Sequence, residues 1–377
     1  MKQYIYADNA ATTKLDIDAY EAMRPYLLES YGNASQPYSF SRSPKKAIKE
    51  AREIIAKCIG ATPEEIIFTS GGTESDNWAI KCVDGMTVDR KTIITSEIEH
   101  HAVLNACRSM ELSGTPVAYL PANKYGRVLP ETLTNYITTG TRLVSVMFSN
   151  NEVGTIQPVQ ELCEIAHQYG ALFHTDAVQA VGHIPIDVKA TGVDLLSASA
   201  HKFNGPKGIG FLYIKKGTPI KAYHNGGSQE FGLRSGTENV ASIVAMAVAL
   251  MKNCEHMQEN QRYIAKLENQ LIQGLDGVDY IRNGDPNNHL PGNISLSFRG
   301  RDGEAILHRM DLKGIIISTG SACDSMQTQI SHVLNAIHVP DNYAPGTIRI
   351  SLGRSNTKEE ITKIVEALKD ILSLIHI

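Results

Sequence analysis

The sequence predicts an α/β protein whose mostly parallel sheet is covered by helices on both faces, joined to a smaller α+β domain. In the first 250 residues, short apolar runs of strand type alternate with segments whose apolar residues recur at helical spacing. Such alternation is typical of right-handed β-α-β units. After about residue 250, a long amphipathic helix, several strands and a final amphipathic helix indicate helices packed on a small sheet.

The expected elements follow one another at short intervals. Strands are expected at 64–70, 92–96, 142–150, 171–178, 194–200 and 208–214. Helices are expected at 44–60, 73–83, 100–112 and 158–170, with Thr73 as the cap of the second. The second part is expected to hold helices at 259–275 and 357–375 and strands at 293–300, 314–320 and 346–354. Ligands of such sheets bind at the carboxyl ends of the strands, so we expect the site there.

The composition excludes several classes of protein. The net charge of -4 and the pI of about 6.4 argue against a nucleic-acid-binding surface. No run reaches the roughly 18 apolar residues of a membrane span. The first residues resemble neither a secretory signal nor a transit peptide, so we expect a cytoplasmic protein. The six cysteines form no CxxC pair, which predicts neither a disulfide framework nor a metal site.

Lys202 stands where an apolar strand passes into a glycine-rich turn, in SASAHKFNGPKGIG (197–210). A lysine in such a place is costly to bury unless it has a task. Partial burial lowers the pKa of an amine and makes it nucleophilic, which suits a Schiff base. A lysine whose amine reaches water from a strand end is the equally compatible alternative.

Glycines and polar residues follow two other strands. In FTSGGTESDN (68–77), Gly72 and Thr73 could hold a phosphate at a helix start, although many such turns never bind one. Asp176 ends another strand and could pair with a protonated ring nitrogen, as pyridoxal chemistry requires, with Gln179 near a ring hydroxyl. An aspartate that caps the following helix is the alternative.

Further candidates lie near other strand ends. His100 or His101 could stack on a flat cofactor ring and move protons near neutral pH, or could be structural. Asn151 could hydrogen-bond a cofactor oxygen or belong to a plain turn. Arg349 and Arg354 are candidates to bind a carboxylate, unless one of them forms a surface ion pair.

Cys323 alone among the cysteines lies in a stretch of small polar residues, STGSACDSMQTQ (318–329). The other five fall within helical patterns or near helix ends: Cys58, Cys82, Cys107, Cys163 and Cys254. A polar stretch of this kind is typical of an exposed, mobile loop. A thiolate there could enter a deep site and leave it carrying a transferred group. An exposed cysteine without a role is the alternative.

Taken together and in this order, these segments resemble the cysteine desulfurases of the NifS/IscS-like group, within the class V aminotransferase family of fold-type I pyridoxal-phosphate enzymes. The resemblance runs from YADNAATT (6–13) to SLGR (351–354). It implies a large cofactor-binding domain over 14–250 with a mostly parallel, seven-stranded type of sheet. It also implies a small α+β domain, made of 1–13 and 251–377, that carries the mobile loop with the catalytic cysteine.

The resemblance implies three catalytic residues. Lys202 would carry pyridoxal 5'-phosphate as a Schiff base and remove the α-proton of the substrate. His100 would stack on the ring and act as acid or base. Cys323 would receive the sulfur of L-cysteine as a persulfide, with release of L-alanine, and deliver it to an acceptor such as an iron–sulfur scaffold or a thiolation enzyme.

Other residues would bind the cofactor or the substrate. Asp176 would pair with the ring nitrogen, and Gln179 and Asn151 would lie near the ring oxygen. The phosphate would be held by Gly72, Thr73, Ser199 and His201. Arg349, together with Asn151, would bind the substrate. Thr237 would reach the phosphate of the neighbouring subunit's cofactor, which implies a homodimer.

Two alternatives remain open, and two segments depart from the family's pattern. A selenocysteine lyase or another pyridoxal-phosphate enzyme of the family is the first alternative, and a relay or regulatory protein with little turnover is the second. GNASQPY (32–38) lacks a proline and a histidine at their usual places. The loop 226–239 has Ser228 and Phe231 where a third glycine and an arginine are common. This loop, which holds Arg234, could line the site or be an ordinary connection.

Overall fold

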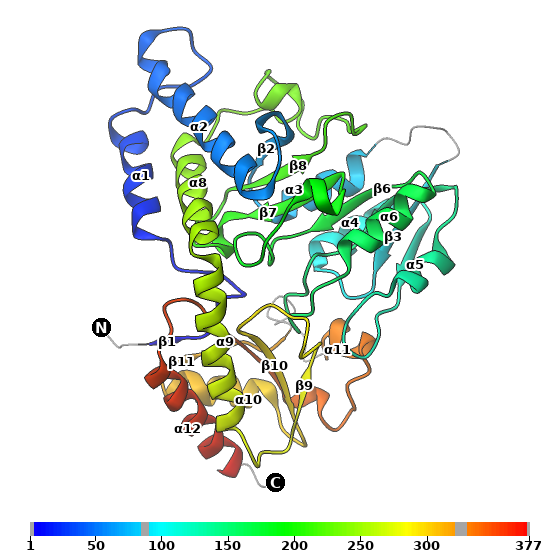
Figure 1. The fold of residues 1–377 in the computed structure, drawn as a ribbon, viewed down its shortest axis with the longest axis vertical. Coiled ribbons are helices and arrows are strands. Elements are labelled where there is room, and N and C mark those ends of the chain that lie inside the picture. The colour runs from blue at the N-terminus through cyan, green and yellow to red at the C-terminus, as the bar shows by residue number, and fades with distance from the viewer. Residues whose placement is uncertain (1–3, 84–89, 321–329, 375–377) are drawn as a thin grey trace.

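The fold is described from a computed structural model that places residues 4–83, 90–320 and 330–374. At its centre lies a seven-stranded sheet in the order β2-β8-β7-β6-β5-β3-β4 (Figure 1). Its strands are β2 Ile66–Thr69, β3 Thr92–Ser96, β4 Val117–Leu120, β5 Thr141–Ser145, β6 Leu172–Asp176, β7 Leu195–Ser199 and β8 Gly210–Ile214. β8 runs antiparallel to both neighbours, and every other neighbouring pair is parallel. The predicted α/β class with a mostly parallel sheet is therefore confirmed.

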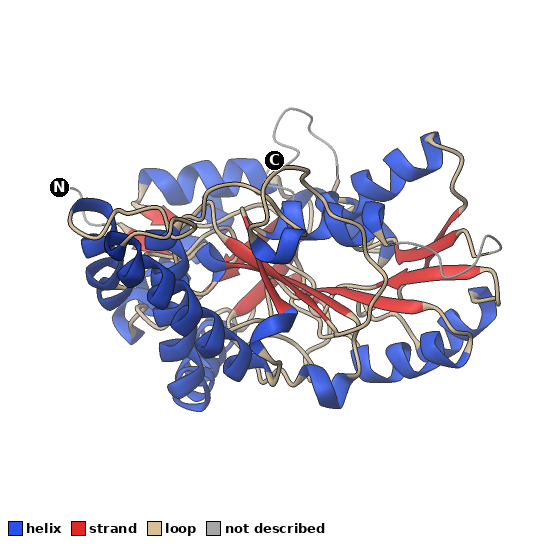
Figure 2. Cartoon of the chain, turned by 90° about the horizontal axis from the view of Figure 1, so that it is seen from above, coloured by secondary structure: helices blue, strands red, loops and turns tan. Residues whose placement is uncertain are grey.

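Helices cover both faces of this sheet, as Figure 2 shows from above. They are α1 Ile17–Leu28, α2 Arg42–Ile59, α3 Gly72–Cys82, α4 His101–Leu112, α5 Pro130–Tyr136, α6 Val159–Gln168, α7 Val188–Thr191 and α8 Val240–Glu255. α3 packs on α4 and contacts β6, β7 and β8, whereas α6 contacts β5 and β6. α1 and α2 pack against α8 at one end of the sheet (Figure 1). Within the placed residues, no helix combines the length and apolar character needed to cross a bilayer.

The second part of the chain surrounds a three-stranded antiparallel sheet in the order β12-β10-β9. Its elements are α9 Met257–Gly274, β9 Tyr280–Asn283, β10 Asn293–Phe298, α10 Gly303–Leu312, β11 Ile315–Ile316, α11 His332–Ala336, β12 Thr347–Ser351 and α12 Lys358–Leu374. α9 and α12 pack together, and apolar side chains such as Leu267, Leu296, Ile348 and Leu368 form a core separate from that of the large sheet. The amphipathic stripes of the two long helices thus meet the small sheet.

The first residues of the chain return to this second part. β1, Ile5–Tyr6, pairs in parallel with β11, and Asp8 bridges to Ser351 at the end of β12. A few residues later, the Thr13 N–H donates to the His201 carbonyl beside the large sheet (2.9 Å). The N-terminal segment therefore contacts both the second part of the chain and the turn that follows β7.

The division into 14–250 and 1–13 with 251–377 stays a proposal. Residue 250 lies inside α8, and α9 begins at Met257 directly after it. Leu250 packs in the core of the large sheet, whereas Ile264 of α9 packs in the second core. The two cores separate between these residues.

Several details differ from the sequence prediction, among them a helix cap and the extents of two strands. Thr73 is not the cap of α3, because the helix already begins at Gly72, preceded by Gly71 at φ 147°. β5 ends at Ser145 rather than at residue 150, and the chain turns at Asn150, whose Oδ1 accepts two following backbone N–H groups. The strand expected at 314–320 is limited to Ile315–Ile316.

Candidate active site

Every strand of the large sheet except β8 ends at the same edge, and a residue predicted to be functional lies at or just beyond four of these ends. β2, β3, β6 and β7 run in one direction, so their carboxyl ends meet there. These ends lead to Gly72, His100, Asp176 and Lys202. The pKa values of His100 and Asp176 depend on each other's charge and on that of Lys202, so the three groups lie within interaction distance.

Lys202 ends a single 3₁₀ turn, Ala200–Lys202, that directly follows β7. Its Nζ donates hydrogen bonds to the carbonyl oxygens of Ala10 (2.6 Å) and Ala11 (2.9 Å). Gln179 Nε2 donates to the same Ala10 oxygen at 2.9 Å. The predicted cofactor lysine and a predicted ring contact are therefore brought together by the N-terminal segment, whose part in the site the residue pattern by itself did not reveal.

Asp176 is the last residue of β6 and is only 6% exposed. Its Oδ1 accepts the backbone N–H of Val178 at 2.9 Å. Burial raises the pKa of this carboxyl, and His100, the Val178 hydrogen bond and Lys202 act against that shift. A buried carboxylate needs a cationic or donor partner, so a protonated ring nitrogen would suit it.

His100 precedes α4 and caps it, since its Nδ1 accepts the N–H of Ala102 at 3.1 Å. Burial lowers the pKa of the ring, while Asp176 acts in the opposite direction. The ring is therefore neutral at pH 7, and a neutral ring whose Nδ1 accepts carries its proton on Nε2. His101 instead packs against His332, with ring centroids 4.9 Å apart. His100 is thus the histidine whose charge and the charge of Asp176 affect each other's pKa.

The turn between β2 and α3 is a tight glycine turn that exposes the N-terminus of α3. At φ 147° a side chain on Gly71 would be strained, and a Cβ on Gly72 would lie 2.6 Å from Val178 Cγ2. Ser199 Oγ, at the end of β7, lies 3.4 Å from where a Cβ on Gly71 would stand. The first N–H groups of a helix have no intrahelical acceptors. Together with the exposed Thr73, the turn forms a cradle suited to a phosphate.

His201 lies next to Lys202, but its ring is engaged with the N-terminal segment. Its Nδ1 lies 3.1 Å from Thr12 Oγ1. Burial, with Lys202 and Lys207 adding to it, lowers its pKa to about 4. The ring is neutral at pH 7 and could reach an anion only as an N–H donor. Its place at a phosphate stays a prediction.

Arg349 and Arg354, the two carboxylate candidates, have different surroundings. Arg349, in β12, donates from Nη2 to Asp8 Oδ1 (2.8 Å) and from Nη1 to the Asn151 carbonyl (3.1 Å). Its Nε is buried and has no partner within the described residues. Arg354 is paired with Asp16 at 2.5 Å. Arg349 therefore links β12 to the segment that holds Asn151, and Asp8 is a partner that the sequence pattern did not indicate.

Cys323 lies in 321–329, outside the described residues. The residues on either side of this segment both approach Glu152. Ser331 Oγ donates to Glu152 Oε2 at 2.6 Å, and a Cβ on Gly320 would lie 2.7 Å from the same oxygen. Gly320 and Ser331, which flank this segment, therefore both lie beside the residue that follows Asn151.

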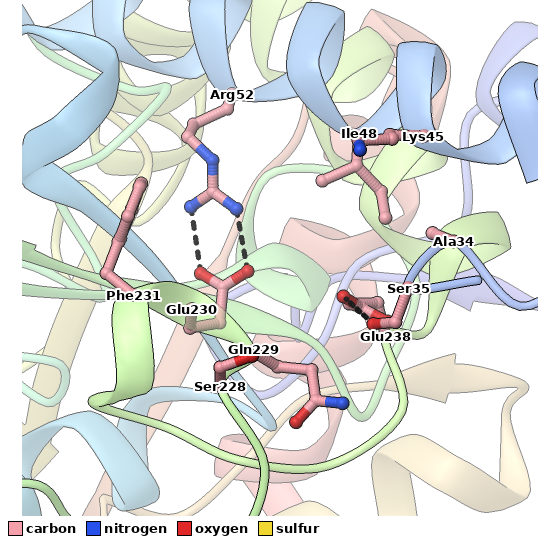
Figure 3. Close-up of a pocket in the computed structure, with 10 residues that line it drawn as sticks. All are labelled: Ala34, Ser35, Lys45, Ile48, Arg52, Ser228, Gln229, Glu230, Phe231 and Glu238. Carbon is pink, nitrogen blue, oxygen red and sulfur yellow. Dashed lines mark hydrogen bonds and ion pairs between the residues drawn. The ribbon is translucent and has the colours of Figure 1, made fainter. Parts of the chain in front are cut away.

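The loop 226–239 carries a buried ion pair next to a cavity of about 220 Å³ (Figure 3). Arg52 of α2 binds Glu230 through two hydrogen bonds, of 2.8 and 2.6 Å, and also lies 5.2 Å from the Phe231 ring centroid. Phe231 is 60% exposed at φ 60°. At Phe231 the loop thus places an aromatic ring against an arginine of α2. Lys202 does not line this cavity.

The same loop is tied to the glycine turn. Arg234 Nε donates to Glu74 Oε1 (2.9 Å), and Glu74 Oε2 accepts the Ser70 N–H (2.8 Å). Thr237 lines a second cavity, of about 230 Å³, together with Ser70 and Gly208. The loop therefore lies beside the predicted phosphate cradle and is more than a remote connection.

His174, two residues before Asp176 on β6, gives a prediction for stability. It is fully buried, and burial lowers its pKa from 6.5 to about 3. Between these pH values the unfolded chain binds one more proton, so the stability that His174 contributes above pH 6.5 is lost as pH falls. Relative to His174→Gln, the free energy of unfolding should fall by about 1.4 kcal/mol per pH unit. Urea unfolding at about pH 7.5 and 5.5 measures this, and the same pH dependence in both proteins would contradict it.

The family described as Aminotransferase class-V matches residues 5–364. The chain belongs to the class-V aminotransferase family. This member is 49% identical over 375 residues to the cysteine desulfurase IscS of Dictyoglomus turgidum, over 99% of this chain and 95% of that protein. The predicted family resemblance is therefore confirmed.

Solved structures agree with the family and with the fold. A NifS-like protein superposes on this class-V aminotransferase family member with a TM-score of 0.94 at 39% identity, over 99% of this chain and 100% of that one. SspA in complex with cysteine superposes with a TM-score of 0.83 at 35% identity, over 94% of this chain and 100% of that one. The predicted fold-type I architecture is confirmed along nearly the whole chain.

Proposed function

We propose that this protein is a cysteine desulfurase, which moves the sulfur of L-cysteine onto Cys323 and releases L-alanine. The observation that carries the proposal is the convergence of Lys202, Asp176 and His100 at one edge of the parallel sheet. The relatives support it, since one is named a cysteine desulfurase and one neighbour holds cysteine. Nothing in these relatives favours a selenocysteine lyase or another enzyme of the family.

We infer that the cofactor is pyridoxal 5'-phosphate, because the residues present fit each of its polar parts. The Lys202 amine suits the aldehyde, the buried Asp176 carboxyl suits the ring nitrogen, and the cradle of Gly72, Thr73 and Ser199 suits the phosphate. When bound, this cofactor supplies an electron-withdrawing ring that stabilises negative charge at the substrate's α-carbon. Three further residues would complete the contacts: Gln179 and Asn151 near the ring oxygen, and His201 at the phosphate.

Arg349 and Lys202 would bind and deprotonate the substrate. The planar guanidinium of Arg349 can hold a carboxylate through two parallel hydrogen bonds. It is buried beside the Asn151 segment, and its Nε–H has no hydrogen-bond acceptor within the described residues. The Lys202 amine would remove the α-proton, and the Ala10 and Ala11 carbonyls, which accept from it here, would orient it.

In the sulfur-transfer step, the Cys323 thiolate would attack the sulfur atom of the substrate. An S–S bond forms and the C–S bond breaks, while the carbon keeps the bonding pair and gains a proton, so that L-alanine leaves. His100 would act as acid or base, and its Nε2–H suits donation. In the sequence, Cys323 follows three positions after Gly320, which lies beside Glu152.

We also propose a homodimer, in which Thr237 reaches the phosphate of the partner's cofactor. Large apolar side chains are exposed on α1 and in the segment that follows it, among them Ile17, Leu28 and Tyr31. Such a surface suits burial against a second copy. The persulfide would then pass to an acceptor protein, such as an iron–sulfur scaffold or a thiolation enzyme.

The proposal is tested by incubating the holoenzyme with L-cysteine and a thiol reductant and measuring sulfide and alanine together. We expect equal amounts of the two products, because each broken C–S bond yields one of each. Alanine released from L-selenocysteine but not from L-cysteine would favour a lyase. Transfer of an amino group to a 2-oxo acid without sulfide would favour an aminotransferase.

A further inference from the structure

A layer of polar side chains is buried beneath α3, on the same face of the sheet as Asp176. The strand register pairs Ser145 of β5 with His174 of β6, and Asp176 with Ser197 of β7. Paired residues of neighbouring strands point to the same face, and so do residues two apart on one strand, so these four side chains lie on one face of the sheet. α3 contacts β6 and β7 and adds Asp76, which is 1% exposed.

His174 connects the members of this layer. Its Nδ1 lies 2.8 Å from Ser145 Oγ, and its Nε2 lies 2.9 Å from Ser197 Oγ. Oδ1 of Asp76 lies 3.7 Å from the same Nε2 and has no hydrogen-bond partner within the described chain. Because hydroxyl groups can donate or accept, they satisfy a neutral ring in either tautomer. A neutral His174 offers no positive charge to Asp76.

The groups that face Asp76 are mainly acidic or neutral. Burial raises the pKa of Asp76 most, the charge on Asp176 raises it further, Ser197 opposes the shift and Glu99 adds to it. Glu99 is itself fully buried, and burial raises its pKa to about 8, so it is neutral at pH 7. An ionised Asp76 would be a second anion in a site closed to water, which is costly without a paired cation.

Asp176 has the partners that Asp76 lacks. His100 and Lys202 both act on Asp176 to favour its ionised form, and the Val178 N–H bonds to its Oδ1. When two carboxyl groups share a buried site, one keeps its proton and the better-supported one ionises. The arrangement therefore places the proton on Asp76.

We propose that Asp76 is held as a neutral carboxylic acid and is a positioning residue, which with His174 and Ser197 keeps Asp176 the only ionised carboxyl beneath the cofactor ring. As an acid, Asp76 can donate a hydrogen bond within the layer and adds no charge that would raise the proton affinity of Asp176. The protonation of Asp76 is independent of the proposed function, whereas its effect on the cofactor rests on that function.

Infrared difference spectroscopy of the full chain, labelled with carbon-13 aspartate, reads this protonation directly. We expect a C=O stretching band of protonated aspartic acid at neutral pH that is absent in Asp76→Asn. The matched control is Asp16→Asn, since Asp16 is 8% exposed but bonded to Lys252 and Arg354, which hold its pKa below the usual value against burial. This control should remove no such band. A protonated band that survives Asp76→Asn, or its absence from wild type, would overturn the proposal.

The positioning role is tested by cofactor affinity and by the pH titration of the absorbance of bound pyridoxal 5'-phosphate. Asparagine keeps a neutral hydrogen-bonding group, so Asp76→Asn should match wild type in both. Asp76→Ala leaves the layer incomplete, and we expect about tenfold weaker affinity and a shifted titration midpoint. Wild-type values in Asp76→Ala would overturn the role.

Two controls keep these outcomes distinct. Thermal unfolding shows whether Asp76→Ala folds, and if it does not, Asp76→Ser takes its place with the same expectation. If wild type itself binds no pyridoxal 5'-phosphate, the proposed function fails, while the infrared result still decides whether Asp76 is protonated.

Discussion

Replacement of Cys323 by alanine is expected to lower sulfide formation from L-cysteine by at least about a thousandfold, the scale of losing a catalytic nucleophile. This variant loses the thiol proposed to take the substrate sulfur, whereas Lys202, Asp176 and His100 are unchanged. Binding of pyridoxal 5'-phosphate should therefore be unchanged. The measurement is sulfide and alanine release with a reductant present, beside an absorbance spectrum of each protein.

Cys82→Ala is the matched control for this experiment. Cys82 ends α3 and is partly exposed, and burial raises the pKa of its thiol, so it is a poor nucleophile at neutral pH. This variant should keep full activity. If alanine and sulfide formation survive in Cys323→Ala, Cys323 is not the sulfur acceptor, and a lyase reaction becomes the better description.

Replacement of Lys202 by alanine should have an effect of the same size for a different reason. The amine proposed to bind the cofactor and remove the α-proton is lost, so we expect activity to fall by at least about a thousandfold. Borohydride reduction of wild type should fix the cofactor on the peptide that contains Lys202, as mass spectrometry can show. The variant should show no such adduct.

Lys207→Ala is the matched control, because it tests whether another lysine of this segment can bind the cofactor. Lys207 lies five residues further on, in the same glycine-rich turn, and is exposed. The Lys207→Ala variant should still form the cofactor adduct on Lys202 and should be fully active. A cofactor adduct on another lysine, or an active Lys202→Ala enzyme, would contradict the proposed site.

The two variants separate the two halves of the proposed reaction. Lys202→Ala should fail before substrate deprotonation, whereas Cys323→Ala should bind both cofactor and cysteine and fail only at sulfur transfer. Spectral changes on adding L-cysteine to Cys323→Ala, without sulfide release, would place the block at that step. This distinction cannot come from activity measurements alone.

Local patterns in the sequence were sufficient to predict where the candidate site lies. Alternating strands and helices imply a parallel sheet, and the carboxyl ends of parallel strands meet at one edge. Gly72, Asp176 and Lys202 each follow or end a predicted strand, so their convergence did not require knowledge of side-chain packing. The capping role expected of Thr73 was wrong because Gly71 and Gly72 let the helix start earlier.

Contacts between distant segments could be decided only by the tertiary structure. Asp8 and Arg349 are 341 residues apart and meet because the N-terminal segment pairs with β11 and bridges to the end of β12. Lys202 binds carbonyls of the N-terminal segment for the same reason.

The buried layer around His174 depends on strand register as well. Register sets which side chains share a face, and Asp76 reaches that face from a helix packed across it. Sequence alone therefore determined the class of fold, the edge of the sheet and the residue types at the strand ends. Packing of segments far apart in the chain determined the partners of those residues and the charge states that the partners impose, because both depend on distance in space.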